Sequence, residues 1–148
     1  MLEPPSVPSF FLVFLLIISP ISQSPSAATI PVSDVLSYSE PLLAKIRLGA
    51  EGDPISQVEV GASFLLGREL SKDYSSAVFW FSLAALQEES GGLYYLGFMR
   101  EKGFGLEQSY KEAAALYRRA SALDYGKAMY RLGRLYRRGE GVVQDDYQ

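Results

Sequence analysis

The stretch AMYRLGRLYRRGEG, residues 128–141, decides the fold, because it combines a helical pattern with a helix stop. Its apolar residues recur at the spacing of one face of a helix with 3.6 residues per turn. The residues of this face are Met129, Leu132 and Tyr136, flanked by Ala128 and Leu135. Gly139-Glu140-Gly141 follows, and glycine adopts the left-handed conformation that ends a helix. We therefore expect a helix followed by a tight reversal.

The same pattern of an apolar helix face followed by a glycine turn occurs at a fixed spacing of 36 residues along the chain. An apolar residue followed by glycine is found at Val60-Gly61, Leu96-Gly97 and Leu132-Gly133. The glycines of the expected turns, Gly67, Gly103 and Gly139, keep this spacing. The chain is therefore an internal repeat.

A second helix is expected after each glycine turn. Ser109 and Glu112 form a capping-box pattern at its start, and Asp73 and Asp145 are candidate caps in the other units. Alanine and aromatic or large apolar residues alternate on its apolar face. These residues are Ala77, Trp80, Phe81 and Ala84 in one unit and Ala113, Leu116, Tyr117 and Ala120 in the next.

Helix pairs of this kind cannot bury their apolar faces alone, so they stack on one another. The pattern predicts an all-α fold, a right-handed α/α solenoid of antiparallel helix pairs with period 36. Its expected parts are a half repeat (39–53), two repeats (54–89 and 90–125) and an incomplete repeat (126–148).

The stretch from Ala128 to Asp145 resembles the Sel1-like repeat, with its alanine, Leu-Gly, Leu-Tyr and Gly-x-Gly-Val elements. The unit before it fits nearly as well, whereas the first unit has Val60 and Glu69 at two consensus positions. The resemblance implies a tetratricopeptide-like scaffold that binds other proteins or peptides. One branch of this family is the endoplasmic-reticulum adaptor of a ubiquitin ligase in misfolded-protein degradation (ERAD), which implies a lumenal adaptor.

The amino-terminal segment has the pattern of a secretory signal peptide. Phe10 to Ile18 is a run of nine apolar residues, shorter than the roughly 20 needed for a membrane-spanning helix. Small residues follow, and cleavage before Thr29 would make residues 1–28 a cleaved leader and 29–38 a linker. Met1 to Ser9 contains no basic residue, so a proline-rich tail is the alternative. We expect the endoplasmic reticulum lumen or secretion, and no stable membrane span.

Composition excludes several kinds of chemistry. The chain has no cysteine and no histidine, so disulfides, Cys or His metal sites and Ser/His or Cys/His nucleophile pairs are excluded. A formal charge of -3 argues against nucleic-acid binding. The Gly-x-Gly turns follow helices and lack the Lys-Ser/Thr of a phosphate loop, and Glu88-Glu89 are adjacent residues that point apart. We expect neither an enzyme nor a cofactor or metal.

Basic residues gather near the end of the repeat region. Between Arg118 and Arg138 lie seven basic residues and one acidic residue. Equivalent positions of the repeat change chemistry freely, as at Arg131, Tyr95 and Glu59, so we expect them to face outward. The candidate partner-binding residues are Tyr95, Phe98, Arg131, Arg134 and Arg138. The alternatives are a solvated basic face and aromatic rings that pack against neighbouring units.

Two further interpretations remain open. The first alternative is a secreted or periplasmic Sel1-like protein. The second is a truncated fragment that completes or blocks a longer assembly through its unpaired third-unit helix. Trp80, on the apolar face of a second helix, is expected in the core and not in a ligand site.

Overall fold

A computed structural model describes residues 38–142. The expected leader (1–28), most of the expected linker and the candidate cap Asp145 lie outside these described residues. Within them the chain is entirely helical apart from turns and loops, as the repeat pattern predicts. None of the helices found in residues 38–142 is both long and apolar enough to cross a membrane.

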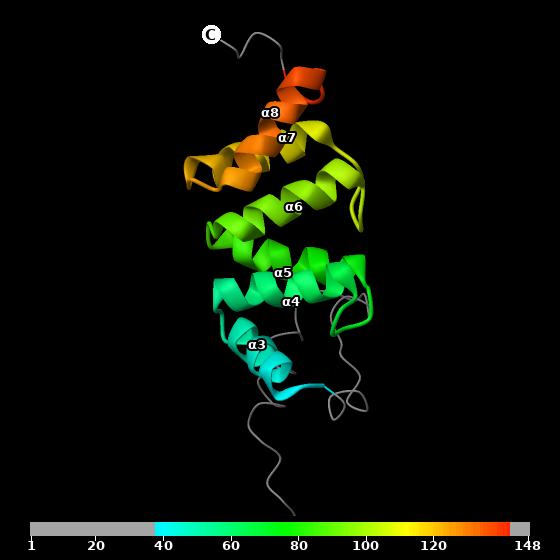
Figure 1. Ribbon diagram of the computed structural model, residues 1–148, viewed down its shortest axis with the longest axis vertical. Coiled ribbons are helices and arrows are strands. Elements are labelled where there is room, and N and C mark those ends of the chain that lie inside the picture. Colours follow the sequence, from blue (N-terminus) through cyan, green and yellow to red (C-terminus); the bar gives the residue numbers. More distant parts are fainter. Residues whose placement is uncertain (1–37, 143–148) are drawn as a thin grey trace, which may run out of the picture.

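The helices stack one after another along the long axis of the molecule, and consecutive helices pack together (Figure 1). Their bounds are α3 (Glu40–Ala50), α4 (Pro54–Leu66), α5 (Tyr74–Leu86), α6 (Ser90–Lys102), α7 (Tyr110–Ala122) and α8 (Gly126–Arg138). Helices α4, α6 and α8 are the first helices of successive units, and α5 and α7 are second helices. The architecture is the expected all-α solenoid of helix pairs.

Local signals fix where the helices begin and end. The side chains of Asp53, Asp73 and Glu89 accept hydrogen bonds from backbone amides at the starts of α4, α5 and α6. At the carboxyl ends of the first helices, Gly67, Gly103 and Gly139 have φ of 65°, 70° and 65°. These are left-handed conformations that favour glycine, so the repeated glycines mark matching helix ends as predicted.

The capping box expected at α7 is only half formed. The Ser109 hydroxyl accepts a hydrogen bond from the Glu112 amide at 3.2 Å. The Glu112 carboxylate, however, pairs with Arg100 at 2.9 Å, and the Ser109 amide donates to the Arg100 carbonyl. Arg100 of α6 therefore satisfies both groups that the reciprocal half of the box would have joined.

This arrangement predicts unequal costs for the two capping residues. Ser109→Ala removes the cap and should lower the free energy of unfolding by about 1 kcal/mol. Glu112→Ala removes only a solvent-exposed ion pair and should cost no more than about 0.5 kcal/mol. Urea unfolding followed by circular dichroism measures both variants. Equal costs would show that the reciprocal capping bond forms after all.

The core is built where second helices press alanine and aromatic side chains against first helices. Ala77, Trp80, Phe81 and Ala84 of α5 are buried, as are Ala113, Tyr117 and Ala120 of α7. The expectation that Trp80 belongs to the core is confirmed, since its side chain is 3% exposed.

Close packing in each complete unit depends on one glycine of the first helix. An ideal Cβ at Gly61 would lie 2.7 Å from the Phe81 ring, and one at Gly97 would lie 2.8 Å from the Tyr117 ring. No side chain fits there, so the aromatic ring of the following helix takes the space. The repeated apolar-Gly pair is thus a socket for an aromatic residue twenty positions later.

The residues that helix α8 buries differ from the apolar face that the sequence predicts for it. Ala128 and Leu135 are its buried residues, whereas Met129 is 46% exposed. The buried side faces α7, which precedes it, and among residues 38–142 no helix follows α8 (Figure 1). Residues that were expected at the centre of the buried face therefore lie at its edge or in solvent.

Candidate functional site

The structure places the five candidate partner-binding residues on two helices. Tyr95 and Phe98 lie on α6, and Arg131, Arg134 and Arg138 lie on α8. We call the group formed by Tyr94, Tyr95, Phe98, Arg131 and Arg134 the aromatic–arginine cluster. It extends over the first helices of two successive units.

Phe98 and Arg131 meet directly. The Arg131 guanidinium lies over the Phe98 ring at 4.6 Å from its centroid, within the range of a cation–π interaction. Phe98 also packs edge-on against Phe104, in the turn after α6, with ring centroids 6.0 Å apart. The ring is therefore held between its own turn and the next unit, with part of it open to solvent.

Tyr95 packs against the preceding unit. Its ring stacks on Phe81 of α5, with centroids 4.8 Å apart and an interplanar angle of 9°. It also contacts Tyr94 edge-on at 5.1 Å. The sideways packing that we considered as an alternative is therefore present at Tyr95, and the side chain is half-buried.

A buried carboxylate that the sequence pattern did not single out lies beneath the cluster. Glu101 of α6 accepts a hydrogen bond from the Tyr117 hydroxyl at 2.8 Å. Arg131 pairs with both carboxylate oxygens of Glu101 at 3.1 Å and donates from Nε to the Tyr94 hydroxyl at 3.3 Å. The Glu101 side chain is 7% exposed and that of Arg131 is 19% exposed. Arg131 is thus fixed on three sides before any partner arrives.

The network shifts the protonation equilibria of its members. Burial, helped by the hydrogen bond to Glu101 and the charge of that carboxylate, raises the pKa of Tyr117 above its ordinary value. Burial opposes the charge of Arg131, but its contacts with Tyr94, Tyr117 and Glu101 outweigh this and raise its pKa. Tyr117 therefore stays neutral and Arg131 charged at ordinary pH.

The raised pKa of Tyr117 predicts a loss of stability in alkali. The unfolded chain releases the Tyr117 proton near the ordinary tyrosine pKa of about 10, whereas the folded chain retains it, so unfolding is favoured as pH rises above that value. Tyr117→Phe should abolish this contribution, and its stability deficit relative to wild type should shrink between about pH 8 and pH 11. Urea unfolding at several pH values measures the deficit. Tyr130→Phe, at an exposed site, is the matched control; a constant deficit for Tyr117→Phe would contradict the assignment.

Arg134 and Arg138 lie outward from this network. Arg134 lies 5.9 Å from the ring centroid of Tyr130, its neighbour on α8, and Arg138 lies 3.8 Å from Glu140 in the following turn. Arg138 is exposed and pairs with Glu140 instead of with the aromatic–arginine cluster, so the structure does not bring all five candidates together.

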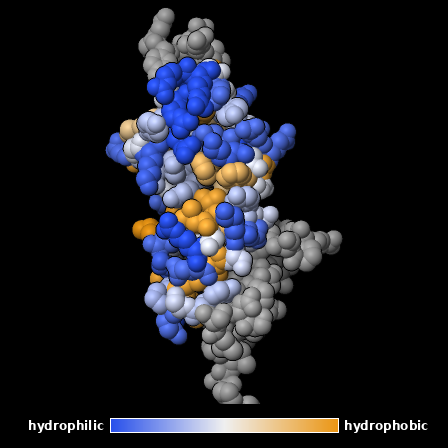
Figure 2. Space-filling model, turned by 45° about the vertical axis from the view of Figure 1, so that its right-hand side comes forward, coloured by the Kyte–Doolittle hydropathy of each residue, from blue (hydrophilic) through white to orange (hydrophobic). Residues whose placement is uncertain are grey.

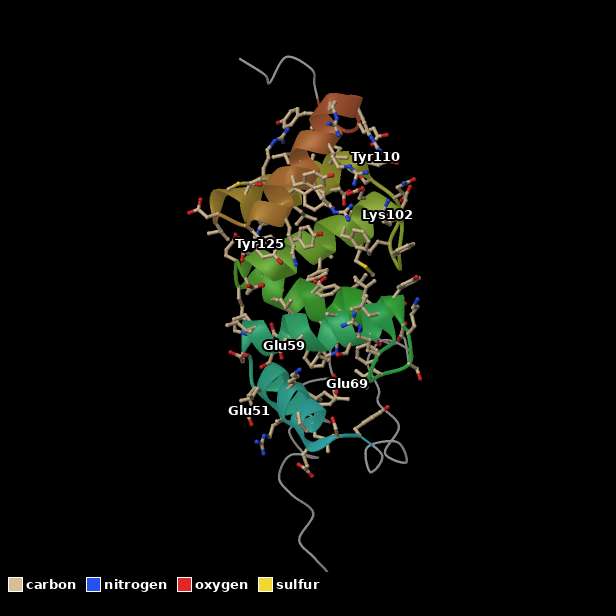
Figure 3. The ribbon with its side chains drawn as sticks, in the orientation of Figure 1. Glu51, Glu59, Glu69, Lys102, Tyr110 and Tyr125 are labelled. Atoms are coloured by element: carbon tan, nitrogen blue, oxygen red, sulfur yellow. The ribbon has the colours of Figure 1, made fainter. Side chains whose placement is uncertain are left out.

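Different residues lie at the two sides of the stack where consecutive helices are connected. Figure 3 shows Tyr125 at the turn between α7 and α8, and Lys102 and Tyr110 on the opposite side, at the connection between α6 and α7. Tyr125 contacts Tyr94 with ring centroids 5.2 Å apart, which continues the aromatic contacts from the cluster to this turn. Hydrophilic side chains cover the end of the stack where α8 lies, while apolar side chains come to the surface nearer its middle (Figure 2).

The remaining candidates have structural roles. Glu89 caps α6 through the Gly92 amide at 2.6 Å, and Glu88 pairs with Arg119 of α7. The two carboxylates thus have different partners, as adjacent residues pointing apart should. Across residues 38–142 no group of three or more acidic side chains is placed to hold a metal ion.

Stacked helix pairs with a surface of aromatic and basic side chains define a helical-repeat scaffold, a class of proteins that binds other proteins. The family model of the Sel1 repeat matches residues 54–88, 90–125 and 126–148. The chain belongs to the Sel1 repeat family, as the sequence resemblance indicated.

Known relatives agree with this assignment. A curated relative, the ERAD-associated E3 ubiquitin-protein ligase component HRD3B of Arabidopsis thaliana, is 31% identical over 97 residues, which cover 64% of this chain and 15% of HRD3B. A protective antigen of uropathogenic Escherichia coli strains with an SLR fold is similar at a TM-score of 0.65 and 32% identity, covering 68% of this chain and 22% of the antigen. A Sel1 repeat protein of Oxalobacter formigenes is similar at a TM-score of 0.66 and 27% identity, covering 70% of this chain and 42% of that protein.

Proposed function

We propose that this chain is a non-enzymatic adaptor of the secretory pathway that binds other proteins through its first helices, with Tyr95, Phe98, Arg131, Arg134 and Arg138 as partner-binding residues. One observation carries the proposal. Arg131 is held over Phe98 by Glu101 and Tyr94, so this part of the surface is ordered before binding. A side chain already fixed in one geometry loses little conformational entropy on association, which favours its use in recognition.

The outer arginines would extend this ordered patch. Arg134, at the edge of the cluster, and Arg138, outside it, lie on the basic end of the stack, where they would meet acidic groups of a partner and steer its approach. Tyr95 contributes by supporting the cluster from the side, since it stacks on Phe81 and contacts Tyr94. Aromatic and arginine side chains are enriched at interaction hot spots.

Relatives suggest where the adaptor would act. HRD3B is an ERAD-associated ligase component, and residues 1–28 have the pattern of a signal peptide. We infer a role in the endoplasmic reticulum, in which the chain holds a substrate or subunit of the degradation machinery. The second candidate is a secreted or periplasmic Sel1 repeat protein, and the similarity to a protective antigen of Escherichia coli at 32% identity keeps a bacterial type of Sel1 protein in view.

The binding proposal is tested by crosslinking and affinity capture of the tagged full-length chain in cells, with captured proteins identified and rebound in purified form. Arg134→Glu/Arg138→Glu should lose the partners that wild type captures, because it reverses two outward-facing charges without touching the core. Arg68→Glu/Lys72→Glu, an exposed pair in the turn after α4, is the matched control and should retain them. Equal recovery from both double variants would reject the site.

The localisation proposal has a separate test. Mature protein purified from the secretory pathway should begin at Thr29 when sequenced from its amino terminus. A cytosolic protein that retains Met1 would contradict the secretory assignment while leaving the binding surface unaffected.

A further inference from the structure

Helix α5 differs from the other helices in residues 38–142 because none of its 13 residues is charged. Each of the other helices has at least one charged side chain. A surface helix usually has charged or polar residues on the face that meets water. The outer face of α5 is therefore unusual, and it lies in the middle of the stack, with α3 and α7 on either side (Figure 1).

The helical spacing identifies which residues of α5 face outward. The side that packs against α4 and α6 is buried. On the opposite side, residues follow one another at intervals of four, three and four positions, the spacing of one helix face. We call these residues, Ser75, Phe79, Ser82 and Leu86, the outer stripe of α5. Ser75 and Leu86 are exposed, Leu86 at 81%, and Phe79 and Ser82 are half-buried.

The next unit shows that the repeat itself does not require large apolar residues in this stripe. In α7 the equivalent residues are exposed, and they are Lys111, Ala115, Arg118 and Ala122. Alanine thus occupies the positions of Phe79 and Leu86 in a helix with the same packing pattern. Two cations alternate with these alanines in α7, whereas α5 presents a phenylalanine and a leucine to water. Packing within the stack therefore does not account for the outer stripe of α5.

The order of small and large residues along the stripe fits a second copy of the same stripe. From Ser75 to Leu86 the order is small, large, small, large, and in the opposite direction it is large, small, large, small. In an antiparallel pair of α5 helices, Phe79 faces Ser82 of the second copy. Leu86 likewise faces Ser75 of the second copy. Each large side chain then meets a small one, as close helix packing requires.

Charges at the two ends of α5 favour the same direction. Lys72, just before the helix, is exposed, and Glu88, just after it, has a side chain that is 60% exposed and pairs with Arg119. In an antiparallel pair, Lys72 of each copy lies at the same end as Glu88 of the other copy. In a parallel pair, like charges would meet at both ends. The stripe between these ends is uncharged, so it does not repel a second copy.

We propose that the outer stripe of α5 is the contact through which two copies of this chain pair, with their α5 helices antiparallel about a twofold axis. A twofold axis brings the same surface of both copies together, which is the arrangement that a self-complementary stripe fits. The aromatic–arginine cluster lies on other helices, α6 and α8, so pairing does not use it. One pair would present two copies of the cluster, which raises the avidity for a partner with two binding segments.

Sedimentation velocity of the full chain over about 1–100 µM tests the pairing. We expect a concentration-dependent change from monomer to dimer. Leu86→Glu should raise the dissociation constant of the dimer at least about tenfold, because it places a charge in an apolar contact. Ala122→Glu, at the exposed equivalent position of α7, is the matched control and should leave the constant unchanged. Circular dichroism checks that both variants are folded.

Three results of this experiment would overturn the proposal. The first is a chain that stays monomeric across the whole range. The second is a self-association that Leu86→Glu does not weaken, since this would assign the contact to another surface. The third is a control, Ala122→Glu, that weakens the dimer as much as Leu86→Glu does.

Introduced cysteines report the direction of the two helices, because the chain has no cysteine of its own. Oxidation of a mixture of Ser75→Cys and Leu86→Cys chains should give mainly mixed disulfide dimers. In an antiparallel pair two copies of position 75 lie about 16 Å apart along the helix axis, beyond the reach of a disulfide. Each variant alone should therefore crosslink at least about tenfold more slowly than the mixture. Faster crosslinking of like positions would show a parallel pair and reject the proposed contact.

Pairing and partner binding can fail separately. Arg134→Glu/Arg138→Glu should form dimers like wild type, because neither residue lies on α5. A dimer without captured partners would reject the proposed function and leave the pairing intact. If the chain is monomeric and Leu86→Glu loses proteins that wild type captures in cells, the stripe binds another protein, and the proposal of a second copy is wrong.

Discussion

Replacing Glu101 with leucine is expected to lower the free energy of unfolding by about 3 kcal/mol, although leucine is the residue at the equivalent position of the first unit, Leu65. The substitution leaves the Arg131 guanidinium, 19% exposed, without its carboxylate partner and the Tyr117 hydroxyl without its acceptor. Breaking one partner of a buried pair is more costly than replacing the whole network with apolar groups.

The combined variant Glu101→Leu/Arg131→Leu/Tyr117→Phe should therefore recover most of the lost stability. Chemical unfolding followed by circular dichroism measures the single and combined variants. Arg100→Ala/Glu112→Ala, which removes an ion pair whose glutamate is 56% exposed, is the control and should cost less than about 1 kcal/mol. If Glu101→Leu is as mild as this control, the network does not form as described.

The second large effect concerns the glycine sockets. Gly97→Ala is expected to destabilise the fold by about 1–3 kcal/mol, because its Cβ would lie 2.8 Å from the Tyr117 ring. The ring cannot easily move away, since Tyr117 is fully buried and its hydroxyl is bonded to Glu101. In an exposed helix the same change would be favourable by about 1 kcal/mol through helix propensity.

Gly133→Ala is the matched control in the same chain. It lies at the equivalent position of α8, where an added Cβ meets nothing within 4 Å. We expect it to be neutral or to stabilise the chain by up to about 1 kcal/mol. Thermal and urea unfolding compare the two variants. Two alanine substitutions of the same sign would show that Gly97 and Gly133 have similar surroundings, contrary to the structure.

Local features of the fold were predictable because they depend on residues close together in the chain. The glycines at the ends of α4, α6 and α8 take positive φ, and Asp73 and Ser109 cap the second helices. The buried alanine and aromatic face of α5 follows from the same spacing argument. The capping box at α7 was half wrong because Arg100, from another helix, draws Glu112 away.

The candidate site was predictable only in part. Comparing equivalent repeat positions led to Phe98 and Arg131, which the structure brings into contact, and to Tyr95, which instead stacks on Phe81. The same comparison would have placed Glu101 outward, since its equivalents are Leu65 and Arg137. Glu101 is buried nonetheless, because long side chains from two other helices satisfy its charge. Whether a charge is buried depends on such distant partners, and sequence spacing does not report them.

Sequence alone determined the period, the helices, the turn glycines and the family, because helix periodicity, caps and left-handed glycines act over a few residues and recur at 36-residue intervals. Only the tertiary structure decided which equivalent positions of the repeat are packed against a neighbouring side chain and which are not. The ring of Tyr117 fills the space beside Gly97, whereas an added Cβ at Gly133 would meet nothing within 4 Å, although the two glycines occupy the same place in the repeat. The reason is physical: packing and charge pairing depend on what the next helix in space supplies, and α8 has none over it among residues 38–142.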